Sequence, residues 1–313
     1  MKRFTLRELI LYCGLSVAVT VLVGAMKQPH AMNGVLVFFH IIAEPIIDQN
    51  AYLLEKDAYY RSLPTQDLQG RRLADQAKLL EAYEKDPVAF VNRYTGVRRT
   101  FLFDAVVDGK NMFRVGTFGD GGKWLSDPQS LRPGAVVYSF GISDDISFDV
   151  EMAGVFGCEV HAFDPGPSVE RSFSKYHPGQ AVGKGKFWYH PVGLGPTSTN
   201  PEKADDLVIE GRKCPVKRLS EFAAELGHPR VDILKIDIEG GEMPALMEIL
   251  SSRTLAKLSV RQLLVECHLW NDEQWSSFVH ILGLLREQGY LISRKEFNPY
   301  DGKCAEFNFL GPE

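Results

Sequence analysis

The chain has 313 residues, a hydrophobic content of 45% and a formal net charge of −5 at pH 7. This is enough for one large domain with appendages, and the composition excludes a disordered or collagen-like chain. A nucleic-acid binder normally carries a basic face, so the negative charge argues against nucleic acid as a partner. The five cysteines show no CxxC spacing and are predicted to be buried free thiols: Cys13, Cys158, Cys214, Cys267 and Cys304.

The N-terminal segment, residues 1–26, is predicted to be a membrane anchor. Leu9 to Met26 is an uncharged run of 18 residues that follows three basic residues. That length can cross a bilayer, and the basic flank favours a cytoplasmic N-terminus, with the rest of the chain in the lumen of the endoplasmic reticulum or Golgi. A cleaved signal peptide is the alternative, because Val23 and Ala25 match a small-residue cleavage pattern. The protein would then be secreted.

Residues 27–97 are predicted to form a partly helical stem. Between Asp67 and Glu84, three apolar residues recur at helical spacing with charges between them: Leu73, Ala77 and Leu80. This pattern indicates an amphipathic helix. A globular domain is predicted to follow, over residues 98–313.

The domain is expected to open with a short strand and a glycine-rich loop. Phe101 to Val107 is strand-like, and the loop contains Gly119-Asp-Gly-Gly-Lys-Trp124. The backbone amides of this loop and Lys123 could meet a carboxylate or close over a ligand. A plain surface turn is the alternative.

From Ala135 onward, predicted strands and helices alternate, which implies βαβ units and a mostly parallel sheet. The predicted strands are 135–140, 159–163, 186–192, 231–238, 261–268, 290–297 and 305–310, and the predicted helices are 146–156, 220–226, 243–250 and 272–288. Asn271 and Gln274 form a capping box before the last helix, and Gly289 can close it. The last two strands are expected to form an antiparallel hairpin at the sheet edge.

The first predicted strand ends in a glycine turn that contains Ser139, Gly141 and Ser143. The next strand ends at Asp164, 23 residues after Gly141, where an acid can accept hydrogen bonds from a ribose diol. A dinucleotide site would need G-x-G-x-x-G, but Ser143 and Ile146 replace its second and third glycines. S-adenosylmethionine, which has a ribose and no pyrophosphate, therefore fits better than NAD. An ordinary turn with a solvated aspartate is the alternative.

A third glycine turn follows the strand that ends near His190. Adenine often packs against a turn at this position, so Gly193 is a further candidate for cofactor binding. His190 itself is expected to have a structural role.

Polar residues also end two later strands. Lys235, Asp237 and Glu239 alternate along one strand, and Glu266 and His268 alternate along the next. These residues predict an acidic and imidazole site that deprotonates a hydroxyl, with His268 as the base because the ordinary pKa of histidine lies near neutrality. Asp237 and His268 are expected within a few ångströms of each other and could also hold a divalent metal. A hydrogen-bonded core pair such as Lys235–Glu266 is the alternative.

The segments GDGGKW, VVYSFGISDDISFD, EVHAFDP, LKIDIEGGE and LLVECH together resemble the FkbM-type S-adenosylmethionine-dependent methyltransferases, and most of all their animal methyltransferase-like branch. The resemblance covers about residues 117–310. It implies an α/β fold with the class I methyltransferase (Rossmann-like) sheet. It also implies that the cofactor lies near Ser139, Gly141 and Asp164, and acceptor chemistry near Asp237, Glu239 and His268. Ser139 and Ser143 depart from the wider methyltransferase pattern, in which an acid and a glycine are common at these positions.

These observations predict a single-pass, lumen-facing methyltransferase that transfers a methyl group from S-adenosylmethionine to an oxygen nucleophile. A glycan hydroxyl is the preferred acceptor, and a small molecule is the other possibility. An NAD-dependent Rossmann enzyme and a catalytically silent binding module with the same fold are the alternatives. The requirement for a metal and the oligomeric state are left open.

Overall fold

The computed structural model describes residues 68–94, 102–117, 121–197, 207–298 and 301–312. All of them belong to one compact unit, Gln66–Glu313. The predicted anchor, Cys13 and most of the predicted stem lie outside the described residues. Within the described ranges, no helix is both long enough and apolar enough to span a bilayer.

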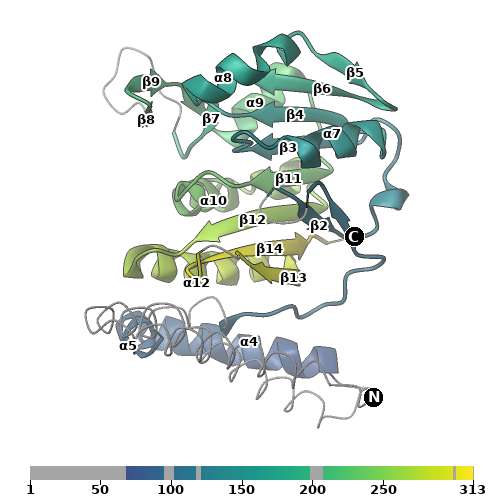
Figure 1. Ribbon diagram of the computed structural model, residues 1–313. Helices are drawn as coiled ribbons and strands as arrows, with labels where there is room; N and C mark the ends of the chain where they lie inside the picture. Colours follow the sequence, from purple (N-terminus) through teal and green to yellow (C-terminus); the bar gives the residue numbers. More distant parts are fainter. Residues whose placement is uncertain (1–67, 95–101, 118–120, 198–206, 299–300, 313) are drawn as a thin grey trace, which may run out of the picture. The chain divides into compact units, whose positions relative to one another are not determined.

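A central eight-stranded sheet organises the unit (Figure 1). Its strands are β3 (Val136–Phe140), β4 (Glu159–Phe163), β5 (Gln180–Val182), β6 (Gly185–His190), β11 (Ile233–Ile236), β12 (Gln262–His268), β13 (Leu291–Phe297) and β14 (Cys304–Leu310). Their order across the sheet is β13-β14-β12-β11-β3-β4-β6-β5. Pairing is parallel from β6 through β4, β3 and β11 to β12. It is antiparallel at β14, β13 and β5.

This order distinguishes the sheet from a dinucleotide-binding one. Apart from the short edge strand β5, its strands numbered along the chain follow the order 3-2-1-4-5-7-6, whereas the dinucleotide fold has 3-2-1-4-5-6. The last strand, β14, enters antiparallel between β12 and β13. The predicted class I methyltransferase sheet and its C-terminal hairpin are therefore confirmed.

Helices cover both faces of the sheet. They are α4 (Leu68–Lys85), α5 (Pro87–Arg93), α7 (Ser147–Gly154), α8 (Pro167–Phe173), α9 (Leu219–Leu226), α10 (Glu242–Ser251), α11 (Thr254–Lys257) and α12 (Asp272–Glu287). Alternation along β3 shows how the faces divide. Tyr138 and Phe140 lie in one apolar cluster with side chains of α9, α10 and α12, whereas Val137 lies in a second cluster with side chains of α7. Both faces of the central strands are thus buried, as expected for parallel strands.

Short elements complete the unit. They are the strands β1 (Phe113–Val115), β2 (Lys123–Leu125), β7 (Gly193–Leu194), β8 (Leu207–Ile209), β9 (Arg212–Cys214) and β10 (Val216–Lys217), and the 3-10 turns η4 (Pro128–Ser130) and η5 (Ser174–Tyr176). β1 and β2 form an antiparallel hairpin. Val115 and Leu125 of this hairpin belong to the same apolar cluster as α7, so the hairpin covers that face of the sheet.

The predicted amphipathic helix is confirmed as α4, which lies against α12. The Tyr83 hydroxyl donates to the carbonyl oxygen of Ser276 (2.9 Å), and the Arg286 guanidinium donates to that of Leu73 (3.3 Å). Leu80 is buried in the core. The capping box of α12 is present as predicted, with the Gln274 amide donating to the Asn271 side chain at 2.8 Å.

Two local predictions were wrong or incomplete. Residues 102–107 form no strand, because this segment runs irregularly and buries Phe103 and Val106 against the core. Its apolar alternation reflects that burial and not sheet pairing. The hairpin β1–β2 and helix α8 were not predicted, since both are too short to show a periodic pattern. The four described cysteines, 158, 214, 267 and 304, are buried free thiols as predicted.

Candidate active site

The strand ends singled out in the sequence meet at one edge of the sheet. β11 lies between β3 and β12, so Phe140 is level with Ile236, and Ile236 is level with Val265. The turn at Gly141 and the carboxylate of Asp237 therefore follow adjacent parallel strands, and His268 ends the next one. Ligands bind outside such carboxyl ends in open α/β sheets.

The position of Gly141 cannot accommodate a side chain, because the end of the neighbouring strand β11 packs against it. Its φ is +75°, and a Cβ at this position would lie 1.5 Å from the carbonyl oxygen of Asp237. The missing side chain thus makes room for β11, in addition to any room it leaves for a ligand. The Lys235 ammonium holds the same turn by donating to the carbonyl oxygen of Gly141 (2.6 Å).

Asp164 organises the turn from the adjacent strand. Its Oδ2 accepts hydrogen bonds from the backbone amides of Ile142 and Ser143, both at 3.1 Å. Its Oδ1 accepts one from the amide of Gly166 (2.8 Å). The carboxylate is half-buried, and each oxygen of a carboxylate can accept more than one bond. Asp164 therefore shapes the glycine turn and keeps acceptor capacity for a ligand.

The other three cofactor candidates differ in exposure. Ser143 is exposed on the turn, with φ +47°. Ser139 is fully buried, and its position beneath the turn leaves no exposed atom for a cofactor, contrary to the predicted contact. Gly193 is also buried: a Cβ there would lie 3.0 Å from the ring of Pro165, the residue after Asp164. Gly193 therefore packs against Pro165, just beyond the end of β4.

Asp149 fills the space beside Ser139. Burial raises the pKa of Asp149 to about 6, against the opposing influence of Lys235 and the Ser139 hydroxyl. The buried groups beneath the glycine turn are thus arranged around the ammonium of Lys235, which balances their charge.

Lys123 occupies the centre of the polar face of β11, β12 and β14. Its ammonium is 3.0 Å from Asp237 Oδ2 and 3.5 Å from Glu266 Oε2, and it also pairs with Glu306. The side chain is 3% exposed. Lys123, which belongs to β2, meets carboxylates of the protein itself, and its contact with a ligand stays a prediction. The alternative of a Lys235–Glu266 core pair is not found: Lys235 donates to Gly141, and Glu266 is bound by Lys123 and by the side-chain amide of Asn298 (2.6 Å).

The charges of this cluster are strongly coupled. Burial would lower the pKa of Lys123, but the carboxylates of Glu306, Asp237 and Glu266 together hold it above its ordinary value. Burial would raise the pKa of Asp237, but Lys235 and Lys123 hold it below the usual range. Burial raises the pKa of Glu306 to about 8, with Lys123 opposing and Glu266 reinforcing that rise. Asp237 therefore stays ionised at neutral pH.

His268 is held by a second acid, Glu242. The Nδ1 of His268 lies 2.9 Å from Glu242 Oε1, and the Glu242 side chain is fully buried. Glu242 also accepts hydrogen bonds from the backbone amides of Ile238 (2.9 Å) and Gly240 (3.1 Å), so it orients the loop as well as the ring. The other ring nitrogen, Nε2, lies 3.5 Å from Oε2 of Glu239, whose side chain is 80% exposed. This nitrogen faces the outside of the strand ends.

The pKa of His268 differs from the near-neutral value expected. Burial by itself would lower it, but the hydrogen bond and charge of Glu242, with Glu266 and Asp237, raise it to about 9. A histidine between carboxylates keeps its proton, because the acids stabilise the imidazolium.

Asp237, Glu239 and His268 offer ligand atoms within 4.8 Å of one another, so Asp237 and His268 lie close together as predicted. Two ammonium groups already face the Asp237 carboxylate, at 3.0 Å (Lys123) and 3.8 Å (Lys235). These ammonium groups neutralise the negative charge of the carboxylate, which a divalent cation would need in order to bind. This arrangement favours acid–base chemistry over a metal at this position.

The sequence reasoning missed two site residues. Glu242 ends the LKIDIEGGE segment but was given no role, although a glutamate at a helix N-terminus is well placed to accept backbone amides. Trp270, 40% exposed, lies beyond β12 with its ring 4.9 Å from that of His268. Only its position two residues after His268 could have drawn attention to it.

The donor set suits S-adenosylmethionine. Asp164, beyond β4, offers acceptor oxygens for a ribose diol, and the glycine turn after β3 lies between it and Asp237. Asp237, beyond β11, is half-buried and already paired with Lys123 and Lys235, so it borders the site on the other side of the glycine turn. An elongated ligand that lies across β3 would therefore extend from Asp164 towards Asp237.

Comparison with known proteins agrees with this assignment. A family model described as a methyltransferase domain matches residues 101–311. Probable methyltransferase-like protein 24 from Homo sapiens is 30% identical over 45% of this chain and 34% of its own length. The AMB antimetabolite synthetase AmbE from Pseudomonas aeruginosa is 37% identical over 29% of this chain and 4% of its own length. The chain therefore spans about a third or less of these relatives.

Among solved structures, Aeropyrum pernix fibrillarin in complex with natively bound S-adenosyl-L-methionine aligns at 13% identity and a TM-score of 0.38. The alignment covers 64% of this chain and 83% of that one. The predicted methyltransferase resemblance is confirmed by the family match, whereas the FkbM-type name stays a prediction. The chain belongs to the methyltransferase-domain family, and S-adenosylmethionine is the cofactor of its class I fold.

Proposed function

We propose that this protein transfers a methyl group from S-adenosylmethionine to an oxygen nucleophile, with His268 as the general base. The observation that carries this proposal is the His268–Glu242 pair at the end of β12. Glu242 fixes Nδ1 of His268. This leaves Nε2 beside Asp237 and Glu239, at the edge of the sheet where the turn at Gly141 also lies. A base whose second nitrogen is oriented by a buried acid is the arrangement used for proton abstraction in catalytic triads.

Each residue then has a distinct task. Bound S-adenosylmethionine would supply the methyl group as an electrophilic sulfonium. His268 Nε2 takes the proton of the acceptor hydroxyl, and the buried Glu242 stabilises the imidazolium that forms. Lys123 and Lys235 hold the carboxylate of Asp237 in place and ionised. A positive charge near His268 lowers its pKa, so a cationic cofactor in the site frees the base for proton abstraction.

Trp270 supports a glycan or other cyclic hydroxyl compound as the acceptor. Its indole is the exposed aromatic surface beside His268, and its Nε1 donates to Asp301 Oδ2 (3.0 Å), which fixes the ring. A flat apolar surface suits the apolar face of a sugar ring, while carboxylates nearby accept hydrogen bonds from its hydroxyls. Asp301, bonded to the indole, and Glu239, beside His268 Nε2, provide such carboxylates.

Cofactor titration followed by an acceptor assay tests this function. In isothermal titration calorimetry of the purified protein, S-adenosylmethionine should bind and NAD should not. Incubation with methyl-labelled S-adenosylmethionine and a panel of glycans and small alcohols should then yield S-adenosylhomocysteine and a labelled ether. Binding of NAD instead would favour the dinucleotide alternative. Binding of S-adenosylmethionine without transfer to any acceptor would favour the silent binding module.

Replacing Asp164 with alanine should weaken binding of S-adenosylmethionine by about 1.5–3 kcal/mol, the range for a hydrogen bond to a charged group. The same change frees the amides of Ile142 and Ser143, so the turn loses its support together with the ribose contact. Titration calorimetry measures the effect. Asp144→Ala, on the exposed side of the same turn, is the matched control and should bind normally. Equal affinity in the two variants would remove Asp164 from the site.

Trp270→Ala should raise the KM for a glycan acceptor about tenfold, which corresponds to the upper range of an aromatic contact. Affinity for S-adenosylmethionine should stay unchanged, because the indole lies on the His268 side of the site and not at the glycine turn. Steady-state kinetics separate the two effects. A fall in cofactor affinity with no change in acceptor KM would contradict the assigned role.

The proposed location is a single-pass membrane protein with its catalytic domain in the lumen of the Golgi or endoplasmic reticulum. It is supported by the uncharged Leu9–Met26 run behind basic residues. In microsomes, the protein should resist carbonate extraction and be protected from added protease. Release into the soluble fraction would favour the cleaved signal peptide, and digestion in sealed vesicles would reverse the orientation.

A further inference from the structure

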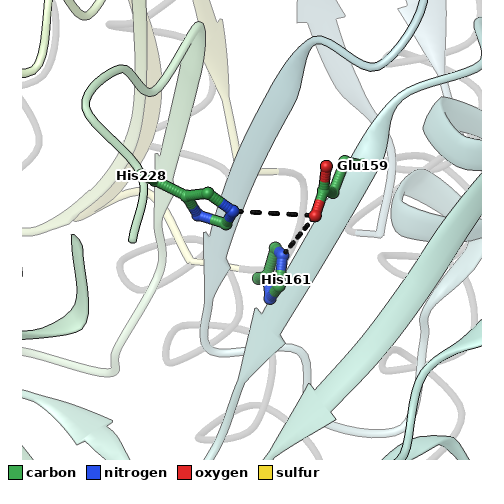
Figure 2. A group of neighbouring side chains, drawn as sticks. All are labelled: Glu159, His161 and His228. Atoms are coloured by element: carbon green, nitrogen blue, oxygen red, sulfur yellow. Dashed lines mark hydrogen bonds and ion pairs between the residues drawn. The ribbon is translucent and has the colours of Figure 1, made fainter. Parts of the chain in front are cut away.

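A second polar cluster lies away from the active site, on β4 and the loop after α9. It consists of Glu159, His161 and His228, whose side chains converge from two elements (Figure 2). Glu159 begins β4, whereas Asp164, which belongs to the cofactor site, follows its end. The five residue steps from Glu159 to Asp164 correspond to roughly 16 Å along a strand. The cluster is therefore separate from the methyl-transfer site.

The distances from the Glu159 oxygen to the two imidazole nitrogens match tetrahedral coordination. Glu159 Oε1 lies 3.4 Å from His161 Nε2 and 3.6 Å from His228 Nε2, and all three atoms fall within 4.8 Å of one another. Zinc bonds of about 2.0–2.2 Å in a tetrahedron place ligand atoms about 3.3–3.6 Å apart. One carboxylate oxygen and two imidazole nitrogens are also a ligand set that zinc prefers.

Both histidines are held by their other ring nitrogen, as metal-ligating histidines usually are. His161 Nδ1 lies 2.9 Å from His190 Nε2, and His228 Nδ1 lies 2.8 Å from the Tyr138 hydroxyl. The His161 ring also stacks on Trp188 at 4.6 Å between centroids and 6° between planes. These contacts point both Nε2 atoms at the Glu159 carboxylate. Figure 2 shows the two imidazole rings directed at this carboxylate.

We propose that Glu159, His161 and His228 bind a zinc ion. The ion would link the start of β4 to the loop that follows α9, two segments otherwise distant in the sequence. His161 is 4% exposed, while His228 and Glu159 are 14% and 36% exposed. The site thus has a rigid buried ligand and two ligands near the surface, which provide an entry path and leave the fourth position to water.

The test is a zinc titration of the purified full-length chain after removal of metal with EDTA. Calorimetry should show one zinc per chain, and zinc should raise the Tm of the protein by a few degrees, since it binds the folded state. Glu159→Gln and His228→Gln should each weaken zinc binding at least about tenfold and abolish the rise in Tm. Tyr138→Phe, which removes only the hydroxyl behind His228, should weaken binding about 10–100-fold.

His280→Gln is the matched control, since it removes an exposed histidine from α12 and should bind zinc normally. In EDTA, the Tm of Glu159→Gln and His228→Gln should stay close to that of the wild type, which separates loss of a ligand from unfolding. Two results would overturn the proposal. One is a wild-type chain that binds no zinc. The other is zinc binding that survives in Glu159→Gln and His228→Gln and is lost in Glu239→Gln, which would place the ion at the active site.

Discussion

Replacing His268 with alanine is expected to reduce turnover about 10²–10⁴-fold, the usual contribution of a positioned general base. Affinity for S-adenosylmethionine should be nearly unchanged, because the cofactor contacts are assigned to the turn at Gly141 and to Asp164. Turnover is measured on an acceptor identified by the labelling assay, and affinity by calorimetry. Full turnover in the variant would show that His268 is a buried structural histidine and that another group accepts the proton.

The pH dependence provides a sharper test of the same residue. The pKa of His268 is raised to about 9 in the free protein, and only its neutral form can accept a proton. The value of kcat/KM for S-adenosylmethionine, which reports groups of the free protein, should therefore rise with pH up to about 9 and level off above it. Glu242→Gln removes the charge that raises this pKa, so the rising limb should move to lower pH. Glu248→Gln, on the same helix but facing Arg218 and Ser252, should leave the limb in place.

A profile that is flat between pH 6 and 9 in the wild type would contradict the base assignment. So would a limb that stays at the same pH in Glu242→Gln. If the rising limb of the pH profile moved in Glu242→Gln but was still present in His268→Ala, the titrating group would be another residue near Glu242.

Replacing Lys123 with methionine is expected to destabilise the fold by about 3–5 kcal/mol, because removing one partner leaves buried charges without compensation. The ammonium contacts Asp237 and Glu266 and pairs with Glu306, and it is 3% exposed. Urea denaturation followed by tryptophan fluorescence gives the free energy of unfolding. The deficit should grow as pH rises from about 7 to 9, the range in which Glu306 loses its proton. At low pH, carboxylates whose pKa is already raised, such as Glu306, take up protons and no longer need the cation.

Lys257→Met is the control for loss of a lysine, since Lys257 is exposed on α11 and its replacement should change stability by less than about 0.5 kcal/mol. Adding Glu306→Gln to Lys123→Met should restore part of the lost stability by removing one unpaired acid. A loss below about 1 kcal/mol in Lys123→Met, or no recovery in the double variant, would mean that the cluster is better solvated than its burial indicates.

The sequence alone determined the order of the main elements and the strand ends that form the site. Period-2 and period-3.6 patterns are local, and so are glycine turns and capping boxes, which is why strand 159–163 and the capping box at Asn271 agree with the structure. Because ligands bind at the carboxyl ends of parallel strands, the strand pattern alone places Gly141, Asp164, Asp237 and His268 in one site.

Only the tertiary structure decided which groups meet and how they are charged. Lys123 reaches Asp237 across 114 residues and Glu306 across 183, through a hairpin too short to leave a periodic signal. The raised pKa of His268 comes from burial beside Glu242, and burial cannot be read from a neighbouring sequence position. The local pattern identifies Gly141 and Asp164. The packing of the Asp237 carbonyl against Gly141, and the hydrogen bonds from the loop amides to Asp164, depend on strand register. Such contacts are set by the arrangement of distant segments, and local sequence preferences do not contain that information.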